Sequence, residues 1–450
     1  MLKRILFTLL ITAFFTPAFS QYRIPPEWHT HSATWLQWPH DSTYYIGYRD
    51  FFEPAWIDMT LALDGSEQVF IIAYDSLELE HITSILADAG ADMDSLQFFV
   101  FPNNDYWVRD NGPIFVLDSL GQTAITDWNF DGWGDDAPYT LCDVIPASIG
   151  GAIGIPVIDL SAYTLEGGAV EHDGNGTFIG TISSILGDGR NPGLTTDDME
   201  EVMQEYLGFE QFIWLEGAYG GGFDITDSHI DGFLRFRDEH TIVTMNTADL
   251  NYWFVNAADR DLIFNALNTD GEAYDYVYLP LTDKNVKTTE GMNTGSKGSY
   301  VNYYEGNQVV LVPVYADDND SLALSIMQDL YPDKEVIGID CRNMFYWGGM
   351  VHCVTQQQPA SEVITTSLSA NHKDLQLLVY PNPASEWLFV QTPFQSGQLS
   401  IQDMQGRILW RETLSQGQYE LPVCHLAEGR YLLTVSYGER MIRSSFVVQH

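Results

Sequence analysis

Short apolar runs alternate with longer amphipathic stretches between residues 21 and 360. The runs at Val69–Tyr74 and Phe98–Phe101 are bounded by polar residues, a pattern typical of buried strands. Between them, apolar residues at helical spacing predict a helix over Leu77–Ala89 that stops at Gly90. The apolar positions of this helix are Leu79, Ile82 and Leu86.

A second helix is expected to begin at Thr195. The Thr195 hydroxyl and Asp198, three residues later, form a capping-box pattern, and Gly208 is a typical residue at the other end. Strands and helices therefore follow one another along this part of the chain. We expect an α/β domain over residues 21–360.

The pattern changes after residue 360. Residues 361–375 are polar, rich in Ser and Thr and without periodicity, so we interpret them as a linker. Short alternating runs follow at residues 388–390, 399–401 and 431–435, with turns between strands at Gln405-Gly406 and Tyr437-Gly438. These runs predict a small all-β sandwich over residues 376–450.

Residues 1–20 have the pattern of a secretory signal peptide. Lys3 and Arg4 precede an apolar run, residues 5–15, and Ala18-Phe19-Ser20 provides a small-residue cleavage site. A membrane anchor is the alternative, but the run is too short to span a bilayer and no later stretch is suitable. We expect an exported protein without stable membrane insertion.

Acidic residues outnumber basic residues threefold. There are 62 Asp and Glu against 20 Lys and Arg, a formal charge of −42, which excludes a nucleic-acid-binding protein because such proteins hold phosphates with Lys and Arg. Hydrophobic residues make up 45% of the chain, so we expect a packed core rather than intrinsic disorder. The acidity either attracts cationic ligands or keeps an exported protein solvated.

Four cysteines allow up to two disulfides in an oxidising compartment. They are Cys142, Cys341, Cys353 and Cys424. A bridge between Cys142 and Cys341 is conceivable, and the sequence leaves the pairing open.

Glycine-rich turns beside ionisable residues mark the candidate chemistry. They are Trp107–Pro113, Glu166–Gly168, Asp227–Asp231 and Gly348–Cys353. Their functional residues are spaced by 166 − 110 = 56, 229 − 166 = 63 and 353 − 229 = 124 positions, close to one, one and two units of about sixty residues. A fifth segment, Ser299–Asn302, falls in the long gap. Evenly spaced motifs of successive units can converge on one axis, as the blades of a propeller do.

These segments contain a thiol, an imidazole and several carboxylates. Taken alone, Cys353 is more often an inert buried thiol, and His229 with Asp231 is more often a structural pair. Together they provide what a cysteine enzyme acting on a cation needs: a nucleophile, a proton shuttle and negative charge to hold the substrate.

A metal site is the competing interpretation. His229, Asp231, His352 and Cys353 are possible zinc ligands, but neither a zincin motif nor a Cys-x-x-Cys spacing is present. The acidic run Asp317–Asp320 lacks the EF-hand spacing for calcium and is better interpreted as a solvated loop. We therefore expect no metal.

At these residues the sequence resembles the agmatine deiminase and Porphyromonas-type bacterial peptidylarginine deiminase family. The matching motifs are Pro26-Glu27-Trp28, Trp107–Pro113, Glu166–Gly168, Arg190-Asn191-Pro192, Asp224–Asp231, Ser299–Asn302 and Gly348–Pro359. The resemblance implies a five-bladed α/β propeller, the pentein fold, over residues 21–360. Residues 376–450 resemble the C-terminal sorting domain of type IX secretion cargo, which implies export through the periplasm to the cell surface or medium and contact with the type IX machinery.

The resemblance also implies the site residues. Cys353 would be the nucleophile, His229 the acid and base, and Asp110 and Asp231 the carboxylates that bind the guanidinium, with Glu166 a further carboxylate near His229. Trp107 and Asn302 would contribute to substrate binding. The reaction converts a guanidine to a ureido group and releases ammonia, and it requires neither a metal nor an organic cofactor.

The substrate is less clearly defined. Secreted peptidylarginine deiminases of this family use a pair of arginines to bind a C-terminal carboxylate, whereas here the segment Asn129–Asp136 is acidic. Its Asp135 and Asp136 favour agmatine, which carries a free ammonium, over peptidyl-arginine. Ser228 replaces a common Gly, and Met350-Val351 replace the usual Gly-Ile. A catalytically inactive cell-surface binding protein is the alternative of another class, although no catalytic residue is missing.

Overall fold

The computed structural model describes residues 21–187, 189–218 and 224–362, and parts of the C-terminal region between 378 and 449. The chain divides into two compact units, residues 1–364 and 365–450. The expected signal peptide, residues 1–20, and residues 363–375 of the expected linker lie outside the described residues. No helix within the described ranges combines the length and the apolar character that a membrane span requires.

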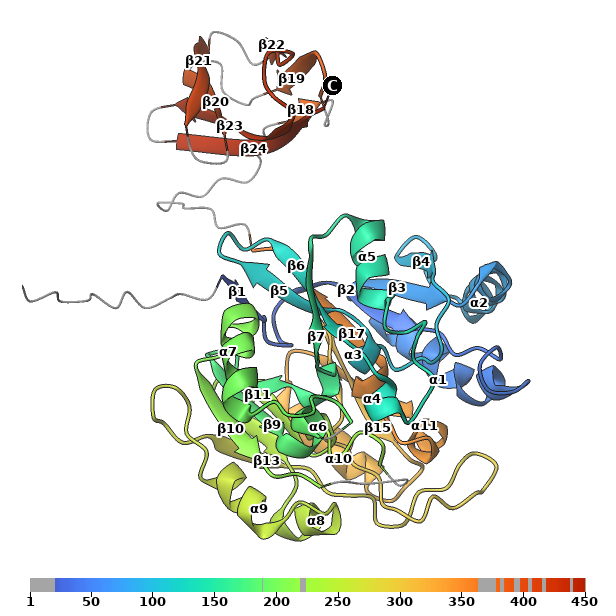
Figure 1. Ribbon diagram of the computed structural model, residues 1–450. Coiled ribbons are helices and arrows are strands. Elements are labelled where there is room, and N and C mark those ends of the chain that lie inside the picture. The colour runs from blue at the N-terminus through green and yellow to red at the C-terminus, as the bar shows by residue number, and fades with distance from the viewer. Residues whose placement is uncertain are drawn as a thin grey trace, which may run out of the picture. The chain divides into compact units, whose positions relative to one another are not determined.

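The described part of the first unit contains five sheets of three or four strands (Figure 1). Two have the orders β1 (Tyr22–Arg23)–β5 (Ile114–Asp118)–β6 (Thr123–Asn129)–β7 (Val157–Thr164) and β10 (Gln211–Leu215)–β9 (Thr177–Thr181)–β8 (Glu171–His172). Two more are β11 (Leu234–Asp238)–β12 (Thr241–Thr244)–β13 (Asp275–Tyr278) and β14 (Tyr304–Glu305)–β15 (Val309–Val314)–β16 (Glu335–Asp340). The fifth is β17 (Gln356–Pro359)–β2 (His31–Gln37)–β3 (Gln68–Ala73)–β4 (Leu96–Val100).

All five sheets share one three-strand arrangement. A first strand pairs antiparallel with a middle strand, which pairs parallel with a third, as in β11, β12 and β13. The same pairing recurs in β5-β6-β7, β8-β9-β10, β14-β15-β16 and β17-β2-β3. Because a parallel pair needs a crossover connection, helices lie between the middle and third strands. The chain therefore repeats a strand–strand–helix–strand unit five times.

The connecting helices complete each unit. They are α1 (Tyr48–Leu63), α4 (Gly132–Asp135), α5 (Ile145–Ile153), α6 (Ile182–Leu186), α7 (Thr196–Leu207), α8 (Thr247–Tyr252), α9 (Ala257–Phe264) and α10 (Asp320–Leu330). In the fifth unit, β17 near residue 359 pairs with β2 near residue 31, so the two ends of this region meet in one sheet (Figure 1).

The two helices predicted from the sequence are confirmed. The first is α2 (Ser76–Ala89), where the Asp75 side chain accepts from two backbone N–H groups and Gly90, with φ 89°, ends the helix. The second is α7, where Thr195 and Asp198 make both bonds of the capping box and Gly208 has φ 81°. The predicted strands at 69–74 and 98–101 are β3 and β4, displaced by one or two residues.

The C-terminal unit is all-β in its described residues. One sheet has the order β18 (Leu378–Tyr380)–β19 (Trp387–Gln391)–β22 (Gln418–Pro422), and the other β21 (Ile408–Leu414)–β20 (Gly397–Asp403)–β23 (Gly429–Tyr437)–β24 (Arg440–Val448). The alternating runs at 388–390, 399–401 and 431–435 are confirmed as strands, and their inward residues form a separate apolar core. The expected turns at Gln405-Gly406 and Gly438 lie outside the described residues.

The Cys142–Cys341 disulfide considered from the sequence is wrong. All four cysteines are free thiols, and Cys142 and Cys341 are fully buried. The Cys142 sulfur accepts the backbone N–H of Asn104 at 3.3 Å, whereas Cys341 precedes the short helix α11 (Arg342–Tyr346).

Candidate active site

The five candidate segments occupy the same position in the five units. Each lies immediately before the first, antiparallel strand of its unit. Asp110 precedes β5, Glu166 precedes β8, His229 and Asp231 precede β11, Asn302 precedes β14, and Cys353 precedes β17. The spacing of about sixty residues seen in the sequence is therefore the repeat of the strand–strand–helix–strand unit.

His229 lies between two of the predicted carboxylates. Its Nε2 donates to Glu166 Oε2 at 2.6 Å, and its Nδ1 is 3.6 Å from Asp110 Oδ1. All three side chains are buried. Burial lowers the pKa of His229, but Asp110 and Glu166 outweigh burial and raise it to about 9. The imidazole is therefore protonated at neutral pH.

Gly168 marks where three segments meet. A Cβ atom at this residue would lie 2.5 Å from His229 Nδ1, 2.8 Å from Asp110 Oδ1 and 3.2 Å from Asp231 Oδ2. The Gly168 N–H also donates to Asp110 Oδ1 at 3.0 Å. The short helix η1 (Gly167–Ala169) thus requires glycine here, because the three polar groups approach its backbone too closely for any side chain.

Cys353 also lies close to Asp231. Its thiol is 3.9 Å from Asp231 Oδ2 and donates to Asn302 Oδ1 at 3.5 Å, and it is partly exposed. Burial, together with the charges of Asp231 and Asp110, raises the pKa of the Cys353 thiol well above its usual range. The thiol is therefore neutral in the free protein, and a cation held beside the two carboxylates would favour its ionisation.

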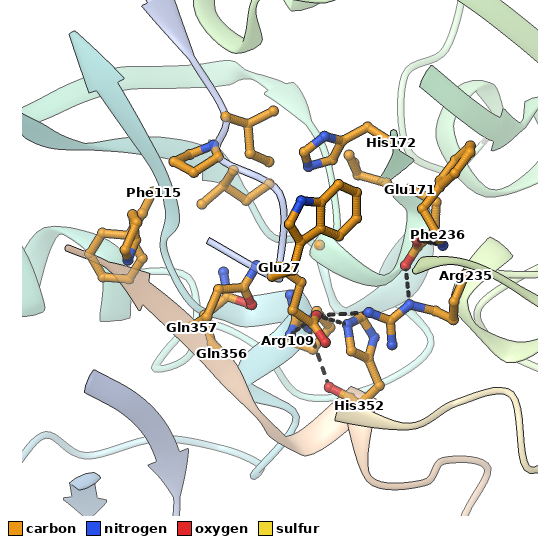
Figure 2. Close-up of a pocket in the computed structure, with 17 residues that line it drawn as sticks. Glu27, Arg109, Phe115, Glu171, His172, Arg235, Phe236, His352, Gln356 and Gln357 are labelled. Atoms are coloured by element: carbon orange, nitrogen blue, oxygen red, sulfur yellow. Dashed lines mark hydrogen bonds and ion pairs between the residues drawn. The ribbon is translucent and has the colours of Figure 1, made fainter. Parts of the chain in front are cut away.

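A buried chain of ionisable side chains holds the Asp231 carboxylate. His352 Nδ1 is 2.7 Å from Asp231 Oδ2, and His352 Nε2 is 2.9 Å from Glu27 Oε2. Figure 2 shows Glu27 between His352, Arg109 and Arg235, in a pocket that also contains Gln356 and Gln357. Burial would raise the pKa of Asp231, but its hydrogen bond and charge interaction with His352 lower it. Asp231 therefore stays ionised.

The family comparisons agree with this geometry. A model described as Porphyromonas-type peptidyl-arginine deiminase matches residues 23–359. The chain belongs to this family. It is therefore a hydrolase that acts on the C–N bonds of amidines. A second model, the secretion system C-terminal sorting domain, matches residues 378–449, which marks this family member as a secreted or cell-surface protein.

Relatives and solved structures cover the same region. A protein of Latilactobacillus sakei named "putative agmatine deiminase" is 30% identical over 369 residues, which are 77% of this chain and 98% of the relative. The agmatine deiminase of Enterococcus faecalis is 27% identical with a TM-score of 0.67, over 76% of this chain and 97% of that chain. A Porphyromonas gingivalis structure named "putative arginine deiminase" is 32% identical with a TM-score of 0.66, over 76% and 99%.

Two further residues of this family member were not anticipated as parts of the site. The Trp133 indole N–H donates to Asp110 Oδ2 at 3.0 Å, and Trp133 itself has φ 60°. The Arg190 Nε donates to both oxygens of Glu166 at 2.8 and 3.1 Å, and its Nη1 donates to Asp227. Their signals were the glycines around Trp133 and the Arg190-Asn191-Pro192 motif, but neither indicated which carboxylate each would contact.

Trp107 is positioned by an aromatic core. It is 8% exposed, its ring centroid lies 4.6 Å from that of Tyr106, and Tyr106 packs against Trp56 at 4.9 Å. A Cβ atom on Gly349 would lie 2.1 Å from the Trp107 ring. Trp107 is thus packed against the glycine turn that leads into Cys353.

Asp135 and Asp136 lie outside this cluster. Both are exposed at the end of α4, and no hydrogen bond or ion pair joins their side chains to the other candidate residues in the part of the chain that the structure describes. Asp131 is closer to the site: it is half-buried, its Oδ1 accepts from Gly134 N–H at 2.7 Å, and burial raises its pKa.

Ser228 shows one departure from the pattern that the resemblance suggested. It has φ 69°, and Asp227 before it has φ 55°, so two consecutive left-handed residues lead into His229. Glycine adopts this conformation most readily. Here the Ser228 backbone N–H is held by Asp224 Oδ2 at 3.1 Å, and its hydroxyl donates to the Ala218 carbonyl at 3.2 Å.

Proposed function

We propose that the protein is a secreted guanidine deiminase that hydrolyses agmatine to N-carbamoylputrescine and ammonia. The observation that carries the proposal is the convergence of His229, Asp110 and Asp231 around Gly168, with the Cys353 thiol 3.9 Å from Asp231. The agmatine deiminases among the relatives support the choice of substrate.

The two aspartates are suited to a planar cation. Asp110 and Asp231 approach the same backbone position from different units, so they can accept charge-assisted hydrogen bonds from separate guanidinium nitrogens. This arrangement would place the guanidinium carbon near Cys353. Trp107, packed behind the Cys353 turn, and Asn302, which accepts from the thiol, would complete the binding site.

Binding of the guanidinium favours loss of the Cys353 thiol proton to solvent. In the first half-reaction, the resulting thiolate attacks the guanidinium carbon and forms a C–S bond. The tetrahedral adduct then breaks one C–N bond. His229, whose pKa is raised to about 9, gives its proton to the departing nitrogen, which leaves as ammonia. A thiouronium group remains on Cys353. Glu166 would hold His229 in orientation through the 2.6 Å hydrogen bond.

In the second half-reaction, water attacks the thiouronium carbon. His229, now neutral, takes a proton from this water. The C–S bond then breaks as the hydroxyl proton of the adduct passes to the departing sulfur, which restores the neutral Cys353 thiol and releases a ureido product. Overall, the guanidinium and one water molecule give a ureido product, ammonia and the proton that the thiol released. The scheme uses only side chains of this chain.

The alternative substrate is peptidyl-arginine, which would be converted to citrulline. Membership of the Porphyromonas-type peptidyl-arginine deiminase family favours this substrate. The acidic segment that ends in Asp135 and Asp136 opposes it, because these charges would repel the C-terminal carboxylate of a peptide and attract the free ammonium of agmatine.

The same proposal covers architecture and export. The repeated unit and the β17–β2 pairing support a five-bladed closed ring over residues 21–360, and the two C-terminal sheets support a sandwich over residues 376–450. Residues 1–20 would direct the chain to the periplasm. Residues 376–450 would then engage the type IX secretion machinery, in agreement with the matched sorting domain.

The test is ammonia release by the purified protein from agmatine, free arginine and a peptide with C-terminal arginine. We expect agmatine to give the highest kcat/KM. A higher value for the peptide would assign the protein as a peptidyl-arginine deiminase, and no ammonia from any of the three would refute the deiminase function.

A further inference from the structure

We infer that His352, anchored by Glu27, is a positioning residue that orients the Asp231 carboxylate toward the substrate. The inference rests on the proposed function, because Asp231 is there assigned to bind the guanidinium. His352 is buried beside Cys353 and was considered from the sequence only as a possible metal ligand. Its side chain instead bridges two carboxylates.

The bridge has a defined geometry. Each ring nitrogen lies within hydrogen-bonding distance of one carboxylate oxygen, 2.7 Å for Asp231 and 2.9 Å for Glu27. An imidazole satisfies both contacts as a donor only when both nitrogens carry hydrogen. Because both ring nitrogens are engaged, the His352 ring cannot rotate without losing both contacts.

Glu27 is itself fixed. Its Oε1 accepts the Glu305 backbone N–H at 2.8 Å, and its Oε2 lies 2.8 Å from Arg235 Nη2 and 3.4 Å from Arg109 Nη2. Figure 2 shows the side chains of Arg109, Arg235 and His352 converging on Glu27. Burial would raise the pKa of Glu27, but Arg235 and His352 hold it well below the usual range, so its charge is retained.

A second set of bonds links the same histidine to the nucleophile. The His352 backbone N–H donates to Asn302 Oδ1 at 3.0 Å, Asn302 Nδ2 donates to the Asp231 carbonyl at 3.2 Å, and the Cys353 thiol also donates to Asn302 Oδ1. The His352 side chain closes this ring of contacts at the Asp231 carboxylate. Nucleophile and carboxylate are thus held at a fixed separation through one residue.

This pocket lies directly behind the candidate site. Three of its lining residues, Arg109, Gly167 and His352, are each followed in sequence by a residue of the site: Asp110, Gly168 and Cys353. One backbone layer therefore separates the charged pocket from the reacting groups. A substitution in the charged pocket can affect substrate binding only by shifting this backbone layer or by releasing the Asp231 side chain.

Two substitutions separate the two bonds of His352. The amide nitrogen of Asn reaches about as far as Nδ1, and that of Gln reaches about as far as Nε2. His352→Asn can therefore keep the donor to Asp231 and lose the donor to Glu27, whereas His352→Gln does the reverse. We expect His352→Gln to be the more damaging variant, although it is the larger of the two substitutes.

The readout is alkylation of Cys353 by two isosteric probes. In both, the thiolate displaces chloride, a C–S bond forms and a C–Cl bond breaks. Chloroacetamidine carries an amidinium that Asp231 can bind, whereas chloroacetamide is neutral. The ratio of the two rates reports on the orientation of Asp231, and the chloroacetamide rate together with the thermal melting temperature reports on the integrity of the fold.

We expect His352→Gln to lower the amidine-to-amide ratio by about 10- to 100-fold, since a misplacement of about 1 Å has effects of this size. We expect a ratio at least about tenfold higher for His352→Asn than for His352→Gln. Glu27→Gln keeps an acceptor for His352 but removes its charge, so the ratio should also fall.

Equal ratios for the two His352 variants, or an unchanged ratio in Glu27→Gln, would overturn the inference. If both His352 variants fail to fold, Glu27→Gln decides alone. A parent protein that releases no ammonia from guanidines would refute the proposed function, yet the probe ratio would still show whether His352 positions Asp231.

Discussion

A single methyl group at Gly168 should disrupt the candidate site more than its size suggests. Gly168→Ala adds a Cβ atom 2.5 Å from His229 Nδ1 and 2.8 Å from Asp110 Oδ1, both below the 3.4 Å of ordinary contact. Gly168 is not among the glycines with positive φ, so alanine can adopt its backbone conformation. The backbone N–H that donates to Asp110 is kept. The substitution therefore displaces the polar groups and leaves the backbone conformation unchanged.

The magnitude follows from these distances. To restore contact at 3.4 Å, His229 must move by 3.4 − 2.5 = 0.9 Å and Asp110 by 3.4 − 2.8 = 0.6 Å. A displacement of about 1 Å in a reacting group lowers the rate by about 100-fold. That loss corresponds to about 2.7 kcal/mol of transition-state stabilisation.

The assay is kcat/KM for ammonia release from the best substrate of the panel. Gly151→Ala, within α5, is the matched control, because a Cβ atom there meets no atom within 4 Å and it should leave kcat/KM unchanged. Circular dichroism and thermal melting of both variants verify folding. A folded Gly168→Ala variant within about threefold of the parent would show that these groups do not need their present positions for catalysis.

Four further predictions test the other parts of the proposal. Cys353→Ser should abolish turnover without changing the melting temperature, because a serine alkoxide forms far less readily than a thiolate; retained activity would contradict covalent catalysis. The pH profile of kcat/KM should be bell-shaped. The value should fall below about pH 6 as Asp110 is protonated and above about pH 9 as His229 loses its proton. The Asp110→Asn variant should lack the acidic limb of this profile. The kcat/KM for agmatine should exceed that for a C-terminal arginine peptide by at least about tenfold, a difference of about 1.4 kcal/mol. The double variant Asp135→Asn with Asp136→Asn should lower this ratio through the KM for agmatine. An unchanged ratio would make both residues part of the solvated surface. A chain that ends after Glu362 should keep its activity, since the Ala360 N–H still donates to the Thr30 carbonyl and Glu362 still pairs with Arg23. The same truncation should prevent export, which immunoblotting of cells and medium would show.

Local signals in the sequence were sufficient to predict individual helices and strands. The caps at Asp75, Thr195, Gly90 and Gly208 involve residues at most four positions from the helix ends that they stabilise, so the sequence contained all of the interacting groups. Strand boundaries were displaced by one or two residues, because strand ends depend on pairing with a neighbour that the run itself does not specify.

The repeated unit could be predicted only through its functional residues. Five segments about sixty residues apart precede the first strand of five similar units, but the strands and helices of these units share no obvious sequence. Many apolar residues can fill a strand of a given length, whereas a residue that reacts with or binds a substrate has few substitutes. The repeat of about sixty residues is therefore visible in the site segments and not in the strands and helices between them.

The supporting residues could not be assigned from the sequence. Glu27 is 325 residues from His352, and Arg190 is 24 residues from Glu166. No periodicity links such pairs, because each contact joins two segments that come together only in the folded chain. The Cys142–Cys341 interpretation was wrong for the same reason: two buried thiols in one chain need not lie close enough to react.

The supporting residues also explain why the acidic limb of the pH profile belongs to Asp110. Glu166 is paired with the buried Arg190 and Asp231 with His352, and these positive partners lower the pKa of both carboxyls although burial raises it. Asp110 instead accepts from the neutral N–H groups of Trp133 and Gly168, and His229 is 3.6 Å away. Burial therefore prevails and raises the pKa of Asp110 to about 6. A substrate guanidinium would add a second positive charge close to Asp110, so binding should lower the pKa of Asp110. The acidic limb should then lie at lower pH for kcat than for kcat/KM.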